Sequence, residues 1–165
     1  MKLEDRITTL IAICRENAES YRRAANINIL IGEPDTAHFF EEIAENRLLA
    51  ADALENKLRN AGKRLNPEIL IAPPREGWTQ PTGNETDPRS VIESCHEAEQ
   101  RAAAAFEEAV QALPQEWHWI LNEYSQHIHS AAAKMHAWLE GKERDEMRER
   151  SGARAASNRV RSPHN

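Results

Sequence analysis

Four stretches of this chain repeat apolar residues at the spacing of an α-helix, and this pattern limits the possible folds more than any other feature. Within each stretch the apolar positions recur three, four or seven residues apart, as on a helix that turns one face toward a core. The stretches cover about residues 3–28, 36–61, 89–113 and 115–140. Only 6 of the 165 residues are glycine and alanine is abundant, which favours helices over a sheet. We therefore expect an all-α fold.

Prolines and glycines separate these stretches. Gly32 and Pro34 lie between the first and the second, Gly62 ends the second, and Pro114 lies between the third and the fourth. Gly141 follows the fourth stretch and is expected to end it. Proline can begin a helix but breaks its interior, and glycine often terminates one. These residues predict four separate helices.

The lengths of the connections predict how the helices are arranged. The first and last links are short, so each should join an antiparallel helical hairpin. The middle link, residues 62–88, is long and rich in proline, with space for a short helical turn near 67–71. Two antiparallel hairpins joined by a long crossover form the ferritin-like four-helix bundle. We place this bundle at residues 1–141 and expect 142–165 to be a polar, basic tail without regular structure.

Charge and cysteine content argue against several classes of function. The net charge of −6 disfavours binding to nucleic acid, whose phosphates repel an acidic surface. No apolar run approaches the roughly 20 residues needed to span a membrane, and the N-terminal residues lack the features of a secretion signal. Cys14 and Cys95 lie far apart, which predicts two reduced thiols in a cytoplasmic protein. Both fall on apolar faces, so we expect small buried side chains rather than a catalytic thiol.

Three polar residues interrupt the apolar faces, namely Asn17, Arg47 and Glu99. Each lies near the middle of its own helix, so the three should meet at one height, with Tyr124 of the fourth helix at the same height. A buried charge is costly unless it has a partner. We therefore expect an Arg47–Glu99 ion pair across the core, assisted by Asn17 and the Tyr124 hydroxyl. Such a structural layer would fix the register of the helices at some cost in stability.

A metal centre is the alternative use of buried polar residues. Ferritin-like di-metal sites take a Glu from each of two helices and a Glu-x-x-His from each of the other two. The first candidates here are Glu16, Glu45, Glu99 and His127, which do not form a complete set, and Arg47 at the same height would repel a cation. We therefore favour no catalytic residue, no metal and no other cofactor. Iron or manganese held by these four residues is the alternative.

The remaining polar features have less specific interpretations. Four of the seven histidines lie on the fourth helix, and His129 and His136 share a face. Solvated side chains are expected, with a surface metal site or a pH switch as the alternative. Trp78 should pin the crossover on the bundle, or mark a partner site if it is exposed. The basic residues of the tail, which could contact an anionic partner, are Arg150, Arg154, Arg159 and Arg161.

Short motifs occur in order along residues 3–140. They are Tyr21-Arg22-Arg23-Ala24-Ala25, Phe40-x-x-Ile43-Ala44-x-x-Arg47, Gly62, Gly77-Trp78, Ile92-x-x-Cys95-x-x-x-Glu99, Phe106-Glu107-x-Ala109 and Leu113-Pro114. Their order and spacing together resemble a bacterial ferritin-like family catalogued as domain of unknown function 2383. At a distance they are similar to rubrerythrin and bacterioferritin. The resemblance implies a four-helix bundle and supplies no function.

Three positions depart from the pattern of that family. Asn46 stands where the family usually has Glu before the Arg, and Ala132 stands where its last helix often has His. Asn17 replaces a usual Gly. The first two changes remove possible ligands, so they weigh against metal chemistry inherited from the family.

These observations lead to a predicted function. The chain is expected to be a non-catalytic structural, stress-related or interaction protein of the cytoplasm. It should self-associate, as a dimer, or bind a protein partner, and it should bind neither nucleic acid nor membrane. The alternative is a ferritin-like iron or manganese protein with oxygen or peroxide chemistry. A third hypothesis is a docking module that uses the crossover or the basic tail.

Overall fold

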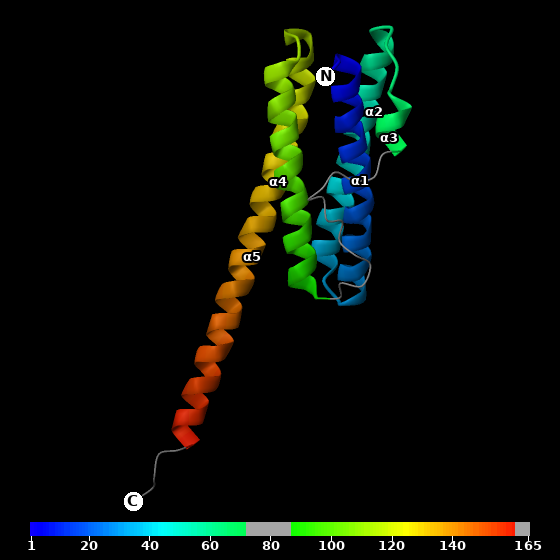
Figure 1. Cartoon of the computed structure of the whole chain (residues 1–165). Helices are drawn as coiled ribbons and strands as arrows, with labels where there is room; N and C mark the ends of the chain where they lie inside the picture. The colour runs from blue at the N-terminus through cyan, green and yellow to red at the C-terminus, as the bar shows by residue number, and fades with distance from the viewer. Residues whose placement is uncertain (72–86, 161–165) are drawn as a thin grey trace, which may run out of the picture.

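The computed structural model describes residues 1–71 and 87–160, with the backbone alone described at 142–146, 148–149 and 153–160. These residues form helices and turns and contain no strand. Figure 1 shows two helical hairpins side by side, and the last helix continues beyond them. In chain order the elements are α1 (Leu3–Leu30), α2 (Pro34–Asn60), α3 (Pro67–Ile71), α4 (Pro88–Ala112), the 3₁₀ turn η1 (Gln115–Trp117) and α5 (His118–Val160).

The first hairpin consists of α1 and α2. A tight turn at Gly32 joins these two helices. Gly32 has a φ of 80°, in the left-handed region that glycine adopts without strain. Just before it, the Ile31 N–H donates to the Ile27 carbonyl at 3.1 Å and closes the last turn of α1. Pro34 begins α2, where no intrahelical N–H bond is lost. Gly32 and Pro34, which separate the first two apolar stretches of the sequence, therefore form this turn.

The second hairpin consists of α4 and α5, which are linked through Pro114 and η1. Asp87 caps α4, because its carboxylate accepts the Arg89 backbone N–H at 3.3 Å. The two hairpins meet mainly where α1 packs against α4, while α2 and α5 meet over a shorter stretch. The short helix α3 packs against α1. The chain thus forms the two hairpins that the connection lengths predict.

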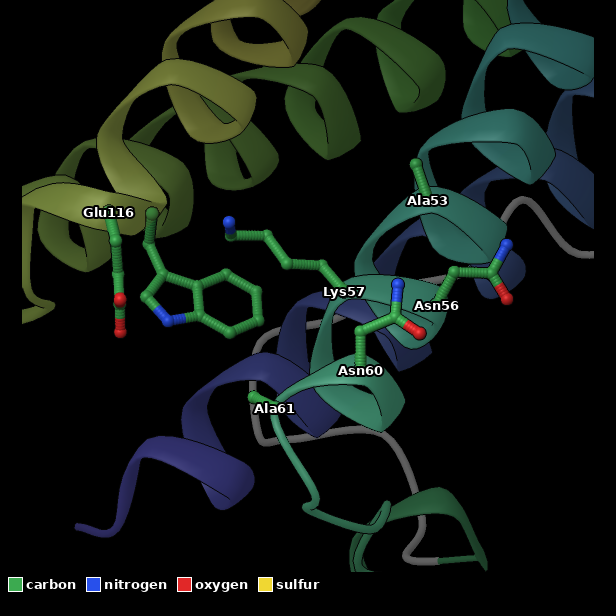
Figure 2. A pocket seen from close by; sticks show the side chains of 7 residues that line it. Ala53, Asn56, Lys57, Asn60, Ala61 and Glu116 are labelled. Carbon is green, nitrogen blue, oxygen red and sulfur yellow. The ribbon is translucent and has the colours of Figure 1, made fainter.

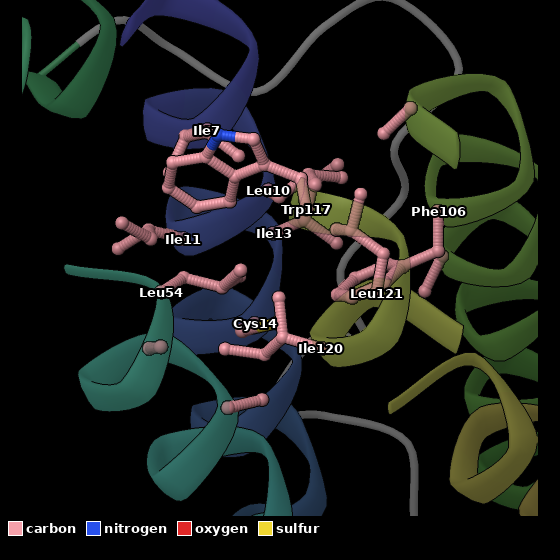
Figure 3. Close-up of a cluster of buried hydrophobic side chains, with 14 of the residues drawn as sticks. Ile7, Leu10, Ile11, Ile13, Cys14, Leu54, Phe106, Trp117, Ile120 and Leu121 are labelled. Atoms are coloured by element: carbon pink, nitrogen blue, oxygen red, sulfur yellow. The ribbon is translucent and has the colours of Figure 1, made fainter. Parts of the chain in front are cut away.

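The core consists of two apolar clusters separated along the bundle by charged residues. One cluster, of which Figure 3 shows a part, includes Ile7, Leu10, Ile11, Leu54, Phe106, Trp117 and Leu121. The other includes Tyr21, Phe40, Ile43, Val91, Ile92 and Met135. Along α2, Arg47 lies between Ala44 of the second cluster and Ala50 of the first. Glu99 occupies the corresponding place on α4, between Cys95 and Ala102.

The last helix is longer than predicted. The helical turn expected near 67–71 is present as α3, whereas α5 continues past Gly141 to Val160. The predicted helix end at Gly141 is therefore wrong, and 142–160 has a helical backbone where we expected a tail without regular structure. Gly141 keeps a helical conformation, unlike Gly32 and Gly62, which have positive φ. A glycine inside a helix costs only about 1 kcal/mol, and the Glu, Arg and Ala residues after it favour helix.

Some sequence predictions concern residues outside the bundle. Trp78 and Arg161 lie outside the described residues, and so do the side chains of Arg154 and Arg159. Arg150 is exposed. Within the described ranges, no helix is apolar over a length that could cross a membrane.

Candidate functional site

The layer between the two apolar clusters contains the strongest polar chemistry in the core. Tyr21 from α1, Arg47 from α2 and Glu99 from α4 meet there. Their exposed fractions are 0%, 1% and 0%, so all three side chains are withdrawn from water. The position of each on the apolar face of its helix brings them together. Such burial is tolerable only when the charges satisfy one another.

Arg47 and Glu99 form a two-pronged ion pair. Arg47 Nε donates to Glu99 Oε1 at 3.1 Å, and Arg47 Nη2 donates to Glu99 Oε2. This fork geometry matches a guanidinium to both oxygens of a carboxylate and is among the strongest pairings in proteins. The Tyr21 hydroxyl also donates to Glu99 Oε1. Arg47 Nη1 donates to Asn46 Oδ1 at 2.6 Å, which connects the layer to the edge of the bundle.

The electrostatics of the layer keep Tyr21 neutral and Arg47 charged near neutral pH. Burial and then the negative charge of Glu99 raise the pKa of Tyr21 well above its ordinary value, so the phenol stays a neutral donor. Burial by itself lowers the pKa of Arg47, but the Glu99 carboxylate outweighs it and raises that pKa overall. Arg47 therefore remains a cation. The layer is a fixed ion pair with one neutral hydrogen-bond donor.

Asn17 and Tyr124 have smaller roles than predicted. Asn17 is buried, and its Nδ2 donates to the carbonyl of Ala98, the residue before Glu99, at 3.5 Å. Tyr124 is only partly buried and packs against the first apolar cluster. The phenol that bonds Glu99 is therefore Tyr21, and its assignment to Tyr124 is wrong. Tyr21 lies on the predicted apolar face of α1. The sequence therefore predicts that its side chain faces the core, but not that its hydroxyl contacts Glu99.

The four residues considered as metal ligands do not come together. Glu99 is bonded to Arg47, Glu16 is partly buried, and Glu45 and His127 are exposed. Among the side chains that the structure describes, no group of three or more His, Cys, Asp or Glu residues is placed to hold a metal ion. Glu99 is the only buried Asp or Glu among the described side chains. The residues present therefore do not fit the di-metal centre of a ferritin-like bundle.

Sequence reasoning missed one Glu-x-x-His motif, at Glu93 and His96 on α4. Its spacing is that of a ferritin-like ligand pair. Glu93 is exposed, however, and its Oε1 lies 2.9 Å from Arg89 Nε on the surface of α4. His96 is half-buried and faces His136 of α5 instead of the core. The motif is thus turned away from the charged layer.

A shallow pocket of about 470 Å³ lies where the end of α2 faces η1. Figure 2 shows Lys57 reaching across it from α2. The Lys57 ammonium lies 5.1 Å from the centre of the Trp117 ring, a cation–π distance. The lining residues are Ala53, Asn56, Lys57, Asn60, Ala61, Glu116 and Trp117. The contact between Lys57 and Trp117 at this pocket joins the end of α2 to η1.

The buried protonated groups near the layer predict alkaline destabilisation. Burial raises the pKa of Cys14 from 9.0 to about 12. A group with a higher pKa in the folded state contributes its full stabilisation below its unfolded pKa and loses it as pH rises. We therefore expect the free energy of unfolding, measured with urea, to fall between about pH 9 and pH 12. One such group changes it by at most about 1.4 kcal/mol per pH unit.

Cys14→Ala should make this decline shallower, because it removes the contribution of the thiol. The contributions of Tyr21 and Tyr124, whose pKa values are also raised, begin near pH 10 and remain. Tyr21→Phe should reduce the later part instead. An identical decline in wild type and in both variants would show that neither group is responsible.

The fold has counterparts among solved structures. An open pore ferritin from the hyperthermophilic archaeon Archaeoglobus fulgidus superposes with a TM-score of 0.64 at 17% sequence identity, over 82% of this chain and 81% of that chain. An uncharacterised conserved protein from Magnetospirillum magnetotacticum MS-1 gives 0.65 at 19% identity, over 86% of this chain and 95% of that one. These likenesses show that the fold is ferritin-like.

No protein-family model matches the chain, and no curated protein matches its sequence. The ferritin-like four-helix fold expected from the sequence is confirmed. Membership of the particular family suggested by the motifs stays a prediction.

Proposed function

We propose that this ferritin-like bundle is a non-catalytic structural or interaction protein whose centre is closed by an ion pair. The observation that supports this is the Arg47–Glu99–Tyr21 layer between the two apolar clusters. In di-metal proteins of this fold, inward-pointing carboxylates and histidines hold metal cations in the bundle core. Here the cation beside the buried carboxylate is a guanidinium of the chain itself.

The layer also resists conversion into a metal site. Both oxygens of Glu99 accept bonds from Arg47, and one also accepts from Tyr21. A metal ion could bind Glu99 only if Arg47 moved away, which would leave a buried guanidinium without its partner. Unpaired buried charges cost several kcal/mol. The ion pair therefore competes with any metal at this position for as long as the bundle is folded.

Surface features support the interaction role. Ile29, Leu30 and Ile31 at the tip of the first hairpin are 55%, 85% and 40% exposed. Adjacent exposed apolar side chains are typical of protein–protein contacts, and we take this tip as the surface for self-association as a dimer. Cys14 and Cys95 are buried free thiols, which fits a reducing compartment such as the cytoplasm.

Metal content and mass in solution test this function on one preparation of full-length protein without a His-tag. After anaerobic loading with Fe²⁺ and desalting, elemental analysis should find no stoichiometric iron, and Glu99→Gln should carry no less than wild type. About two equivalents of iron per chain, lost in Glu99→Gln, would overturn the non-catalytic assignment.

Sedimentation equilibrium should give the mass of a dimer for wild type and of a monomer for Leu30→Glu. A wild-type monomer would remove self-association from the proposal.

A further inference from the structure

The outer face of the second hairpin contains a groove that lies apart from the charged core layer. It runs between α4 and α5, has a volume of about 530 Å³, and has a floor of alanines from both helices. Its polar walls are His96, Gln100, Glu107, His129 and His136. Histidine imidazoles are common ligands for transition metals. The groove is therefore a place to look for a site on the surface of the bundle.

Two of these histidines face each other across the two helices. The rings of His96 on α4 and His136 on α5 have centroids 5.7 Å apart and planes inclined by 29°. Two imidazoles bound to one tetrahedral zinc ion have ring centroids about 5 Å apart, given metal–nitrogen bonds of about 2.0–2.1 Å. To bind one ion, the two rings turn about their broad terminal torsions until a nitrogen of each points to it.

We propose that His96 and His136 bind a divalent transition metal of the zinc class, which bridges α4 and α5. Within the described part of the chain no third His, Cys, Asp or Glu completes the set, so water occupies the other coordination positions. The site is open, because His136 is 60% exposed, and an ion can enter from solvent. It lies on the outer face of the hairpin, so it is independent of the core ion pair and of the proposed function.

The surroundings of the pair are acidic. Glu140 Oε1 lies 3.0 Å from His136 Nε2, and Glu107 Oε1 lies 2.8 Å from His129 Nε2. These carboxylates add negative charge along the groove.

The chain offers a matched control for this site. His38 and Glu42 on α2 form an i,i+4 pair with Nε2 and Oε1 3.0 Å apart, the same spacing and distance as His136 and Glu140. Both histidines are exposed, at 70% and 60%. Of the two, His136 stacks on a histidine from another helix. A single helical His–Glu pair and a bridge between two helices can therefore be compared within one protein.

Calorimetric titration of untagged full-length protein with Zn²⁺ near pH 7.5 tests the proposal. Wild type should bind about one equivalent in a saturable step, and Zn²⁺ should raise its Tm. His96→Ala and His136→Ala should each weaken this step by about tenfold or more and abolish the rise in Tm. His96→Gln, which keeps more of the side-chain volume, serves as a second variant, and circular dichroism verifies that each variant is folded. His38→Ala should bind as wild type does.

Two results would overturn the proposal. One is Zn²⁺ binding that is unchanged in His96→Ala and His96→Gln, because α4 would then supply no ligand. The other is an equal loss in His38→Ala, because binding would then be a general property of exposed histidines. Iron loading into the core would leave the zinc titration unaffected, so this proposal and the proposed function fail separately.

Discussion

Replacing Arg47 with Met should destabilise the bundle by about 3–5 kcal/mol, because it leaves the Glu99 carboxylate buried without a partner. Arg47 is 1% exposed and donates to both oxygens of Glu99, so water cannot replace the guanidinium without opening the core. The measurement is the free energy of unfolding in urea, taken from the midpoint and slope of a two-state transition. A loss below about 0.5 kcal/mol, the range of ordinary surface substitutions, would show that Arg47 is not buried in solution.

A second interhelical ion pair provides the control. Arg15 on α1 contacts Glu55 on α2 at 2.8 Å, but its side chain is 40% exposed. Exposed pairs contribute about 0–1 kcal/mol, so Arg15→Met should have a small effect. The triple variant Tyr21→Phe, Arg47→Met, Glu99→Leu removes every polar member of the layer at once. It should recover most of the stability, because apolar replacements of buried pairs are often neutral or stabilising.

Trp117→Ala should cost about 3–5 kcal/mol, the range for removing a large aromatic side chain from a core. Trp117 is 1% exposed and fills the first apolar cluster beside Ile7 and Leu10. Its ring also lies under the Lys57 ammonium, so the substitution removes a cation–π contact between η1 and α2. Both the urea midpoint and the thermal midpoint should fall.

Trp119 is a close control for this substitution. It lies two residues further along the chain and is 76% exposed. Trp119→Ala should change the free energy of unfolding by no more than about 0.5 kcal/mol. Equal effects of the two substitutions would mean that the start of α5 does not pack in solution as it does in this structure.

The sequence was sufficient for the fold because its local signals agree with one another. The apolar periodicity locates the helices, and Gly32, Gly62 and Pro114 lie at their ends. Arg47 and Glu99 are predictable as partners because each interrupts an apolar face at mid-helix, where a buried charge requires a counter-charge. That inference depends on spacing along the chain and on the cost of burial, both of which the sequence contains.

The errors concern features that local spacing does not determine. Tyr21 and Tyr124 both lie near the charged layer, and only the packing of α1 against α4 decides which hydroxyl reaches Glu99. Gly141 resembles a helix end, but its backbone conformation depends on whether the residues after it continue the helix. The pairing of His96 with His136 depends on the register between α4 and α5. Sequence periodicity leaves open both the relative positions of two helices and the point at which a helix ends.

The division of the charged layer between the two hairpins has a consequence for assembly. The first hairpin carries Tyr21 and Arg47, and the second carries Glu99, so neither half can neutralise its own core face. A chain severed within the crossover would give two fragments, one with a cation and one with an anion at the centre of its apolar surface. Pairing of like fragments would bury two equal charges, whereas pairing of unlike fragments cancels them. The layer therefore makes each hairpin selective for the other, because only the pairing of unlike halves buries a neutralised charge.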